Sequence, residues 1–451
     1  MNFEDIPIEL LLKIIYYCVP LSITNYATHL RRDANPLSRA WAKEKEAQVL
    51  GNVHHKKDLR NSTLVTLSCV NKNLRRLCLP VLFRNIICYN EDHLRNFQKS
   101  FISSVQEYTK SLTIFNPFPC VGEERTYTII SLELSTHLSL TELFLDNAKL
   151  DNTLLQLLTE TPTLRILSIT RSLLPWIGSE PCEFENWGLL PSISDLFISP
   201  PIAADALFIH ALEDSLVNLH LNSSNCRLGV FQPFFCTLGL HVMTMPRLRR
   251  LTLERFSICQ AEFRMFLRRH SFLSLNEVNI SAFSGSYSLS WVVRAMMELT
   301  GQMWLGVDDN PWFEEPKEGN CWEKYEVEAF GCLIKGRAFS QLGLTFALNE
   351  EDDVPLDDPS LLVPLFKMPC FLPLEVLRLS ADPEFIGTIS DIVKGIIKVQ
   401  YILPSLKCLA LGWDFRRCRW EPHQILVDRK VLEEHDVNNE AQNIMYSYRT
   451  N

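Results

Sequence analysis

The chain has 451 residues, of which 44 are basic and 53 acidic, so its formal net charge is −9. This acidic balance argues against nucleic acid as a partner, because phosphate binding needs an excess of Lys and Arg over a whole face. Only 16 residues are glycine, which argues against a nucleotide-binding fold with several glycine-rich loops. Leucine is unusually frequent, with 69 residues, and its spacing is the main signal in the sequence.

The N-terminal segment is acidic and then amphipathic, which is not the pattern of a signal peptide. No run of about 18 uncharged apolar residues follows, so the sequence predicts no membrane span. The 14 cysteines form no Cys-x-x-Cys pair, and most lie among apolar residues, which favours a reducing compartment. We therefore expect a protein of the cytoplasm or the nucleus.

Residues 1–87 are expected to form a small helical module. The stretch 6–18 predicts a short helix with Pro7 in its first turn, where a missing backbone N–H is tolerated. The stretch 63–86 predicts a second apolar helix and a basic third one. A polar insertion at about residues 22–60 separates these two halves.

The two halves resemble the F-box motif, in the form found in fungal F-box proteins with C-terminal leucine-rich repeats. Ile6-Pro7 stands where the motif has Leu-Pro, and the run Ser68-Cys69-Val70-Asn71-Lys72-Asn73-Leu74 stands where it has Ser-x-Val-Cys-Arg-x-Trp, with Leu74 at the Trp position. The resemblance implies docking on the Skp adaptor and, through it, on a cullin. It places the adaptor contacts at Ile6, Pro7, Leu10, Leu11, Ile14, Leu67, Val70, Leu82 and Phe83.

A six-residue unit, L-x-x-L-x-L, recurs after this module. Good copies begin at Leu140, Leu164, Ile193, Leu216, Leu248, Leu275, Leu374 and Leu406, and weaker ones at Thr109 and Phe339. Successive copies lie 23 to 35 residues apart, except for one step of 64, and proline precedes several of them. The alternation at the end of each unit predicts a short strand, and the stretches 151–160 and 260–270 predict helices between strands.

A strand followed by a helix, repeated about every 30 residues, is the unit of a leucine-rich solenoid. We therefore expect an α/β fold in which residues 105–415 form an irregular leucine-rich-repeat solenoid, with parallel strands on the concave face and helices on the convex face. An insertion is expected at about 301–325, and a polar tail at 421–451. The insertion holds Trp304, Trp312 and Trp322, and it either binds a partner or packs against the repeats.

Side chains between the apolar positions of each strand are expected on the concave face. The candidate substrate-binding residues there are Phe144, Phe197, His220, Arg250 and Arg378. A register one residue different would bury the two aromatic rings instead. A set of basic residues forms either a pocket for a phosphorylated segment or solvated charges paired with acids such as Glu254 and Glu262: Arg247, Arg249, Arg250, Arg264, Arg268 and Arg269.

No motif of an ATPase, a metalloprotease, a serine hydrolase or a dinucleotide-binding fold occurs, and we expect no catalytic residue, cofactor or metal site. The pair His54-His55 lacks neighbouring ligands at metal-binding spacing. The F-box resemblance implies an SCF-type ubiquitin ligase, in which the chain is expected to be a non-catalytic receptor for an unknown protein substrate. The alternative is a leucine-rich-repeat scaffold with no ligase role, in which the N-terminal helices only cap the repeats.

Overall fold

The fold is described from a computed structural model of the full chain. The structure describes residues 8–11, 15, 65–88, 107–114, 139–145, 152–170, 184–203, 205–223, 235, 238–256, 258–270, 274–282, 287–300, 326–346, 369–381, 405–406, 408–413 and 425–428. The chain divides into two compact units, Met1–Leu216 and Val217–Asn451. The predicted insertions at 22–60 and 301–325 and the pair His54-His55 lie outside the described residues.

The first unit opens with helical segments at residues 8–11 and 65–70 and helix α5 (Lys72–Leu82). Asn71 caps α5, because its side chain accepts the Leu74 N–H at 2.8 Å. Ile15 and Cys78 are buried together in a cluster that includes Leu67, Leu77, Val81 and Leu82. The two halves of the predicted module therefore pack against each other, although more than 40 residues separate them in the sequence.

In the described part of the first unit, five strands form a parallel sheet whose spatial order follows the chain. They are β1 (Asn85–Cys88), β2 (Ser111–Ile114), β3 (Glu142–Leu145), β4 (Ile166–Thr170) and β5 (Asp195–Ser199). Besides α5, the described helices of this unit are α9 (Asn152–Thr159), the 3-10 turn η2 (Trp187–Leu189) and α10 (Asp205–Ala211). Strand β1 begins within the range predicted for the helical module, three residues after α5 ends.

The second unit contains parallel and antiparallel strands. They are β6 (Asn218–Asn222), β7 (Arg250–Phe256), β8 (Glu277–Ala282), β9 (Tyr287–Ser288), β10 (Glu326–Lys335), β11 (Ala338–Phe346), β12 (Val376–Ala381), β13 (Cys408–Trp413) and β14 (Ile425–Asp428). Neighbours are parallel from β6 to β8 and from β11 to β13. Strand β10 is antiparallel to β8, β9 and β11, and β14 is antiparallel to β13.

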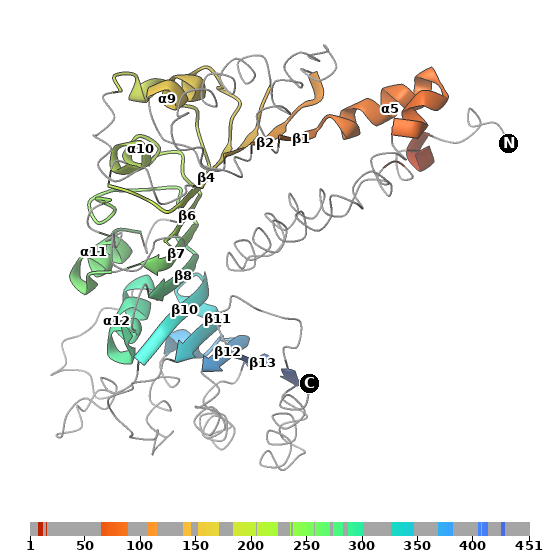
Figure 1. The fold of residues 1–451 in the computed structure, drawn as a ribbon. Coiled ribbons are helices and arrows are strands. Elements are labelled where there is room, and N and C mark those ends of the chain that lie inside the picture. Colours follow the sequence, from red (N-terminus) through yellow and green to blue (C-terminus); the bar gives the residue numbers. More distant parts are fainter. Residues whose placement is uncertain are drawn as a thin grey trace, which may run out of the picture. The chain divides into compact units, whose positions relative to one another are not determined.

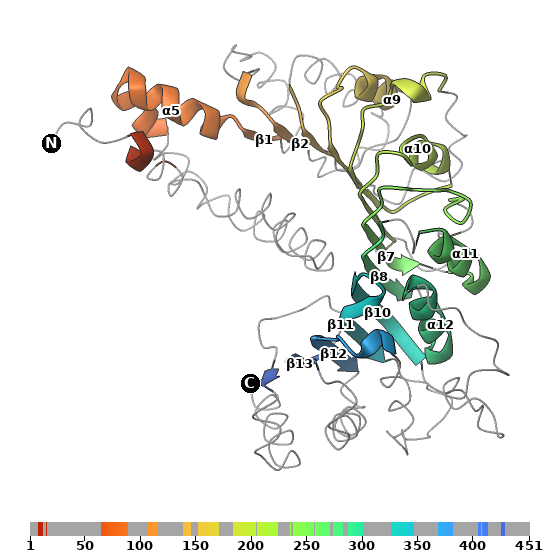
Figure 2. The same ribbon diagram turned by 180° about the vertical axis from the view of Figure 1, so that it is seen from behind.

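Helices α11 (Gln260–His270) and α12 (Leu289–Thr300) and the turn η5 (Pro369–Phe371) complete the second unit. In both ribbon views α9 and α10 lie on one side of the strands of the first unit, and α11 and α12 lie on one side of the strands of the second (Figures 1 and 2). The predicted combination of helices and mostly parallel strands is thus confirmed. The hairpin of β10 and β11 was not predicted, and β14 lies in the segment predicted as a polar tail.

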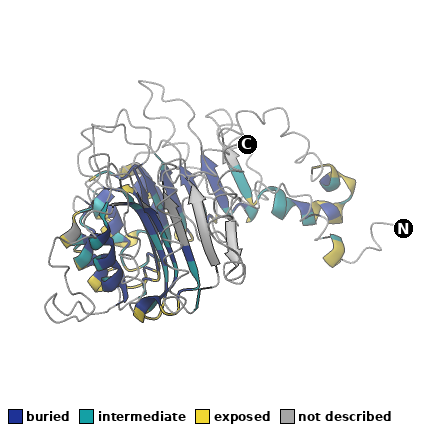
Figure 3. Cartoon of the chain, turned by 90° about the horizontal axis from the view of Figure 1, so that it is seen from below, coloured by how far each residue is buried: buried dark blue, intermediate teal, exposed yellow. Residues whose placement is uncertain are grey.

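Apolar residues of the L-x-x-L-x-L units form the core on the helix side of the strands. In the copy at residue 248, Leu248, Leu251 and Leu253 have no exposed surface, and the copy at residue 164 is equally buried. The strands are drawn mostly in the buried colour in Figure 3, whereas exposed residues lie on the helices. Burial of three such side chains in each copy supplies the main favourable term for folding, roughly 2 kcal/mol per side chain.

Backbone hydrogen bonds join neighbouring strands at the start of β2 to β5, β7 and β8. The carbonyl of Arg165 accepts the N–H groups of Ser194 and Asp195 at 2.8 and 3.0 Å. The carbonyl of Arg249 accepts those of Asn276 and Glu277, both at 2.9 Å. The same double acceptance occurs at Arg84, Lys110, Thr141 and Val217.

A hydroxyl side chain strengthens this junction. Thr163, Ser215 and Ser274 each precede the first apolar residue of a copy, and each donates to the carbonyl of the first apolar residue of the copy before. These three hydrogen bonds are 2.7 to 2.8 Å long. The repeated pairing indicates that the copies are structurally equivalent, as their sequences suggest.

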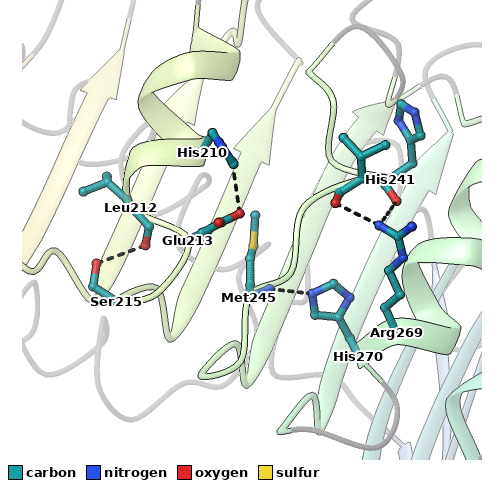
Figure 4. A network of polar contacts seen from close by, with 9 residues as sticks. His210, Leu212, Glu213, Ser215, His241, Met245, Arg269 and His270 are labelled. Carbon is teal, nitrogen blue, oxygen red and sulfur yellow. Dashed lines mark hydrogen bonds and ion pairs between the residues drawn. The ribbon is translucent and has the colours of Figure 1, made fainter. Parts of the chain in front are cut away.

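His270, at the C-terminal end of α11, fixes the turn that leads into β7 (Figure 4). Its Nε2 accepts the Met245 N–H at 2.9 Å, and its Nδ1–H donates to the Phe266 carbonyl at 2.8 Å. These two bonds require the neutral ring. Arg269 beside it donates to the carbonyls of His241 and Val242. The same figure shows two contacts of the first unit. The Ser215 hydroxyl donates to the Leu212 carbonyl, and His210 Nδ1 lies 3.0 Å from a carboxylate oxygen of Glu213.

Burial lowers the pKa of His270 below its ordinary value of 6.5. The unfolded chain therefore binds a proton at a higher pH than the folded one, and the contribution of His270 to stability is lost as the pH falls below about 6.5. We predict that His270→Gln lowers the urea midpoint at pH 8, and that its difference from wild type shrinks toward pH 5.5. His210→Gln, at an exposed histidine, is the control; a difference for His270→Gln that stays constant with pH would contradict the assignment.

Candidate functional site

Among the described residues of the helical module, four large apolar side chains are exposed. Ile8 and Leu10 keep 53% and 49% of their surface exposed, and Val65 and Val70 keep 49% and 54%. Leu67, which lies between Val65 and Val70, packs instead in the cluster around Ile15 and Cys78. A small helical module that exposes aliphatic residues on two of its segments has the character of a protein-docking surface.

The predicted adaptor contacts divide between this surface and the interior of the module. Leu10 and Val70 are exposed, whereas Leu67 and Leu82 pack in the internal cluster. Leu11 and Phe83 are half-buried, and Ile6, Pro7 and Ile14 lie outside the described residues. Ile8 and Val65 are equally exposed but were not among the predicted contacts. The sequence signal for them is that apolar residues occur on both faces of these short helical segments, so that one face has no partner within the module.

The second candidate site is the strand face of the second unit that points away from the buried leucines. The register places His220 of β6 beside Thr252 of β7, and Thr252 beside Asn279 of β8. The row continues through Gly331 of β10 and Gly343 of β11 to Arg378 of β12. The predicted residues His220 and Arg378 therefore belong to one row across the sheet, but the side chain of Arg378 lies outside the described residues.

Glu254 organises the part of this face on β6 and β7. Its Oε1 lies 3.1 Å from Nε2 of His220, and its Oε2 accepts a hydrogen bond from Asn222. Next to Glu254, Arg255 has a φ of 54°, and the pairing of β7 with β8 shifts register between Leu253 and Phe256. This bulge turns Phe256 back into the core, where it has no exposed surface.

Glu277 organises the neighbouring part on β7 and β8. Its Oε2 lies 3.0 Å from Nε of Arg250, and its Oε1 accepts from Asn279 at 3.3 Å. The side chain of Glu277 is 7% exposed, whereas that of Arg250 is 38% exposed. A buried carboxylate thus holds an exposed guanidinium and an amide in fixed positions on the strand face.

The two predicted aromatic anchors are in the first unit. Phe144 stands in register between Thr113 and Ser168, and Phe197 stands beside Ser168. Phe144 is only 4% exposed, so little of its ring is available to a substrate in this structure. Phe197 is half-buried and keeps part of its surface exposed.

The basic residues of α11 do not form an open anion pocket. Arg264 and Arg268 both bind the carboxylate of Glu298 on α12, with their closest N–O distances at 2.8 and 2.7 Å. Arg269 is bound to two backbone carbonyls. The interpretation as paired charges is therefore correct for these residues, but the acid is Glu298 and not Glu254 or Glu262. The sequence does not reveal this partner, because α12 was not predicted.

Within the described part of the chain, no group of three metal-ligating side chains comes together, and no helix is long and apolar enough to span a membrane. Burial raises the pKa of the Cys332 and Cys370 thiols to about 12, so neither is a reactive thiolate at neutral pH.

The chain matches no protein-family model, and a search of curated proteins finds no relative.

The ion pairs of Glu298 give a testable contribution to stability. Burial acts to raise its pKa, but hydrogen bonds from Arg268 and Arg264 outweigh that effect and lower it. The contribution is therefore present above the ordinary carboxylate pKa of 4.5 and is lost as the pH falls through the lower folded value. We predict that Glu298→Gln destabilises the protein by roughly 1 kcal/mol at pH 7, after discounting for solvent screening, in urea titrations.

That loss should shrink as the pH is lowered toward 3. Glu185→Gln is the matched control, because Glu185 is exposed and has no ion-pair partner among the described residues. A loss for Glu298→Gln no larger than for Glu185→Gln at pH 7 would show that the ion pairs do not contribute.

Proposed function

We propose that the chain is the non-catalytic substrate-receptor subunit of an SCF-type cullin–RING ubiquitin ligase. In this proposal the N-terminal module is F-box-like and docks on the Skp adaptor, and the following copies are leucine-rich repeats that hold a protein substrate. The cytoplasm or the nucleus is then its place of action.

The exposure of Ile8, Leu10, Val65 and Val70 carries the proposal. Leaving four aliphatic side chains half in water is unfavourable, by roughly 1 kcal/mol each relative to burial, unless a partner covers them. Two of them, Leu10 and Val70, are residues at which the F-box resemblance places adaptor contacts. The internal packing of Ile15 with Cys78 supports the same interpretation, because it assembles both halves of the motif into one module.

The alternative is a repeat scaffold without a ligase role. It is supported by the short connection between α5 and β1, since α5 ends at Leu82 and β1 begins at Asn85. A helical module that is joined so directly to the first strand also suits a cap on the end of a repeat array. Binding of the adaptor discriminates between the two functions.

We predict that purified full-length protein binds purified Skp adaptor, measured by isothermal titration calorimetry. Replacing Leu10 and Val70 together by Asp should weaken binding at least tenfold, because two charges would be buried in an apolar interface. Leu372→Asp is the control, since Leu372 is an apolar residue of the second unit that is 45% exposed. Failure of the wild-type protein to bind the adaptor would reject the ligase role and leave the scaffold.

A further inference from the structure

The strand face formed by β7, β8 and β10 presents polar side chains. Neighbouring residues do not satisfy all of their hydrogen-bonding groups. Among the described residues, Glu277 is the single polar partner of the Arg250 guanidinium, which it contacts through Nε. A guanidinium has five N–H donors, so its terminal N–H groups are left for another acceptor. The buried Glu277 fixes the side chain, which reduces the entropy lost when that acceptor binds.

Asn279 lies beside this group, above the floor of the face. Its Nδ2 donates to Glu277, and its Oδ1 lies 2.4 Å from where a Cβ on Gly331 would be. The amide can therefore occupy this position over β10 because residue 331 is glycine. The next residue in the row is Gly343, so β10 and β11 together offer no side chain at this level.

The local charge decides what kind of group can bind here. The carboxylate of Glu277 lies beside the Arg250 guanidinium and neutralises its charge. A phosphate or a carboxylate bound to Arg250 would lie close to Glu277, whose negative charge offsets the attraction of Arg250. Neutral acceptors and donors meet no such penalty, and a peptide main chain presents both at regular intervals.

We propose that Arg250 and Asn279 bind an extended peptide segment of a partner protein through its main-chain carbonyl and amide groups, with Gly331 and Gly343 as the floor. This inference rests on the proposed function only in that the chain binds a protein. It does not require the adaptor, and it applies equally to a scaffold. It predicts recognition of an extended backbone with uncharged side chains, not of a phosphorylated or acidic motif.

The test uses the full-length protein and two displayed peptide libraries, one of random 16-residue peptides and one with a fixed phosphoserine. Peptides enriched by the wild type are then measured for affinity by fluorescence polarisation. Arg250→Lys keeps the charge and the pair with Glu277 but removes the extra donors, and should weaken binding about tenfold, as expected for loss of a charge-assisted hydrogen bond. Gly331→Ala should have a similar effect, because its Cβ displaces the Asn279 amide.

Arg249→Lys is the matched control and should change affinity less than twofold, since Arg249 is exposed and precedes the strand. Circular dichroism melting of each variant excludes unfolding as the cause. Three results would overturn the inference: no peptide enriched by the wild type, equal affinity for Arg250→Lys and Arg249→Lys, or enrichment of phosphorylated or acidic peptides alone. None of these bears on adaptor binding by the helical module, so the two proposals fail independently.

Discussion

The double hydrogen bond at the start of β2 to β5, β7 and β8 is the constraint on which the rest of the structure depends. One carbonyl, such as that of Arg165 or Arg249, accepts two consecutive N–H groups of the next copy. This fixes the register between copies, and a shift of one residue would turn every leucine to the other face. Because the register is fixed, the leucines face the helices and the residues between them face away.

One face of the strands therefore contributes to stability, and the other face is available for recognition. The buried leucines hold the strands, so polar residues on the other face can be held in place without filling the core. Glu254 and Glu277 are buried carboxylates of this kind, each bound by side chains of its own or the adjacent strand. Removal of the partner of a buried carboxylate is strongly destabilising, because it leaves an uncompensated buried charge. Their role is to orient His220, Arg250 and Asn279.

Much of the fold could be predicted from the spacing of leucines, because burial of one strand face imposes a period of two. The strands at Leu143, Leu167 and Leu251 lie where the pattern places them. Strand β10 was missed, because it lies in the single long step of the pattern and pairs antiparallel. The ion pair of Arg264 with Glu298 could not be predicted, since it joins two helices whose packing is not encoded in local spacing. The exposed faces at Ile8 and Val65 likewise depend on which side of a helix packs inward.

Hydrogen–deuterium exchange of the full-length protein, resolved to single amides by fragmentation mass spectrometry, tests the stacking of the copies most directly. The account predicts slow exchange at the amide pairs that follow each junction, among them Ser194 and Asp195 in the first unit and Asn276 and Glu277 in the second. Exposed amides outside these hydrogen bonds, such as that of Glu185, should exchange rapidly. Exchange at the paired amides as fast as at Glu185 would contradict the stacked arrangement and, with it, the strand face on which the peptide site is built.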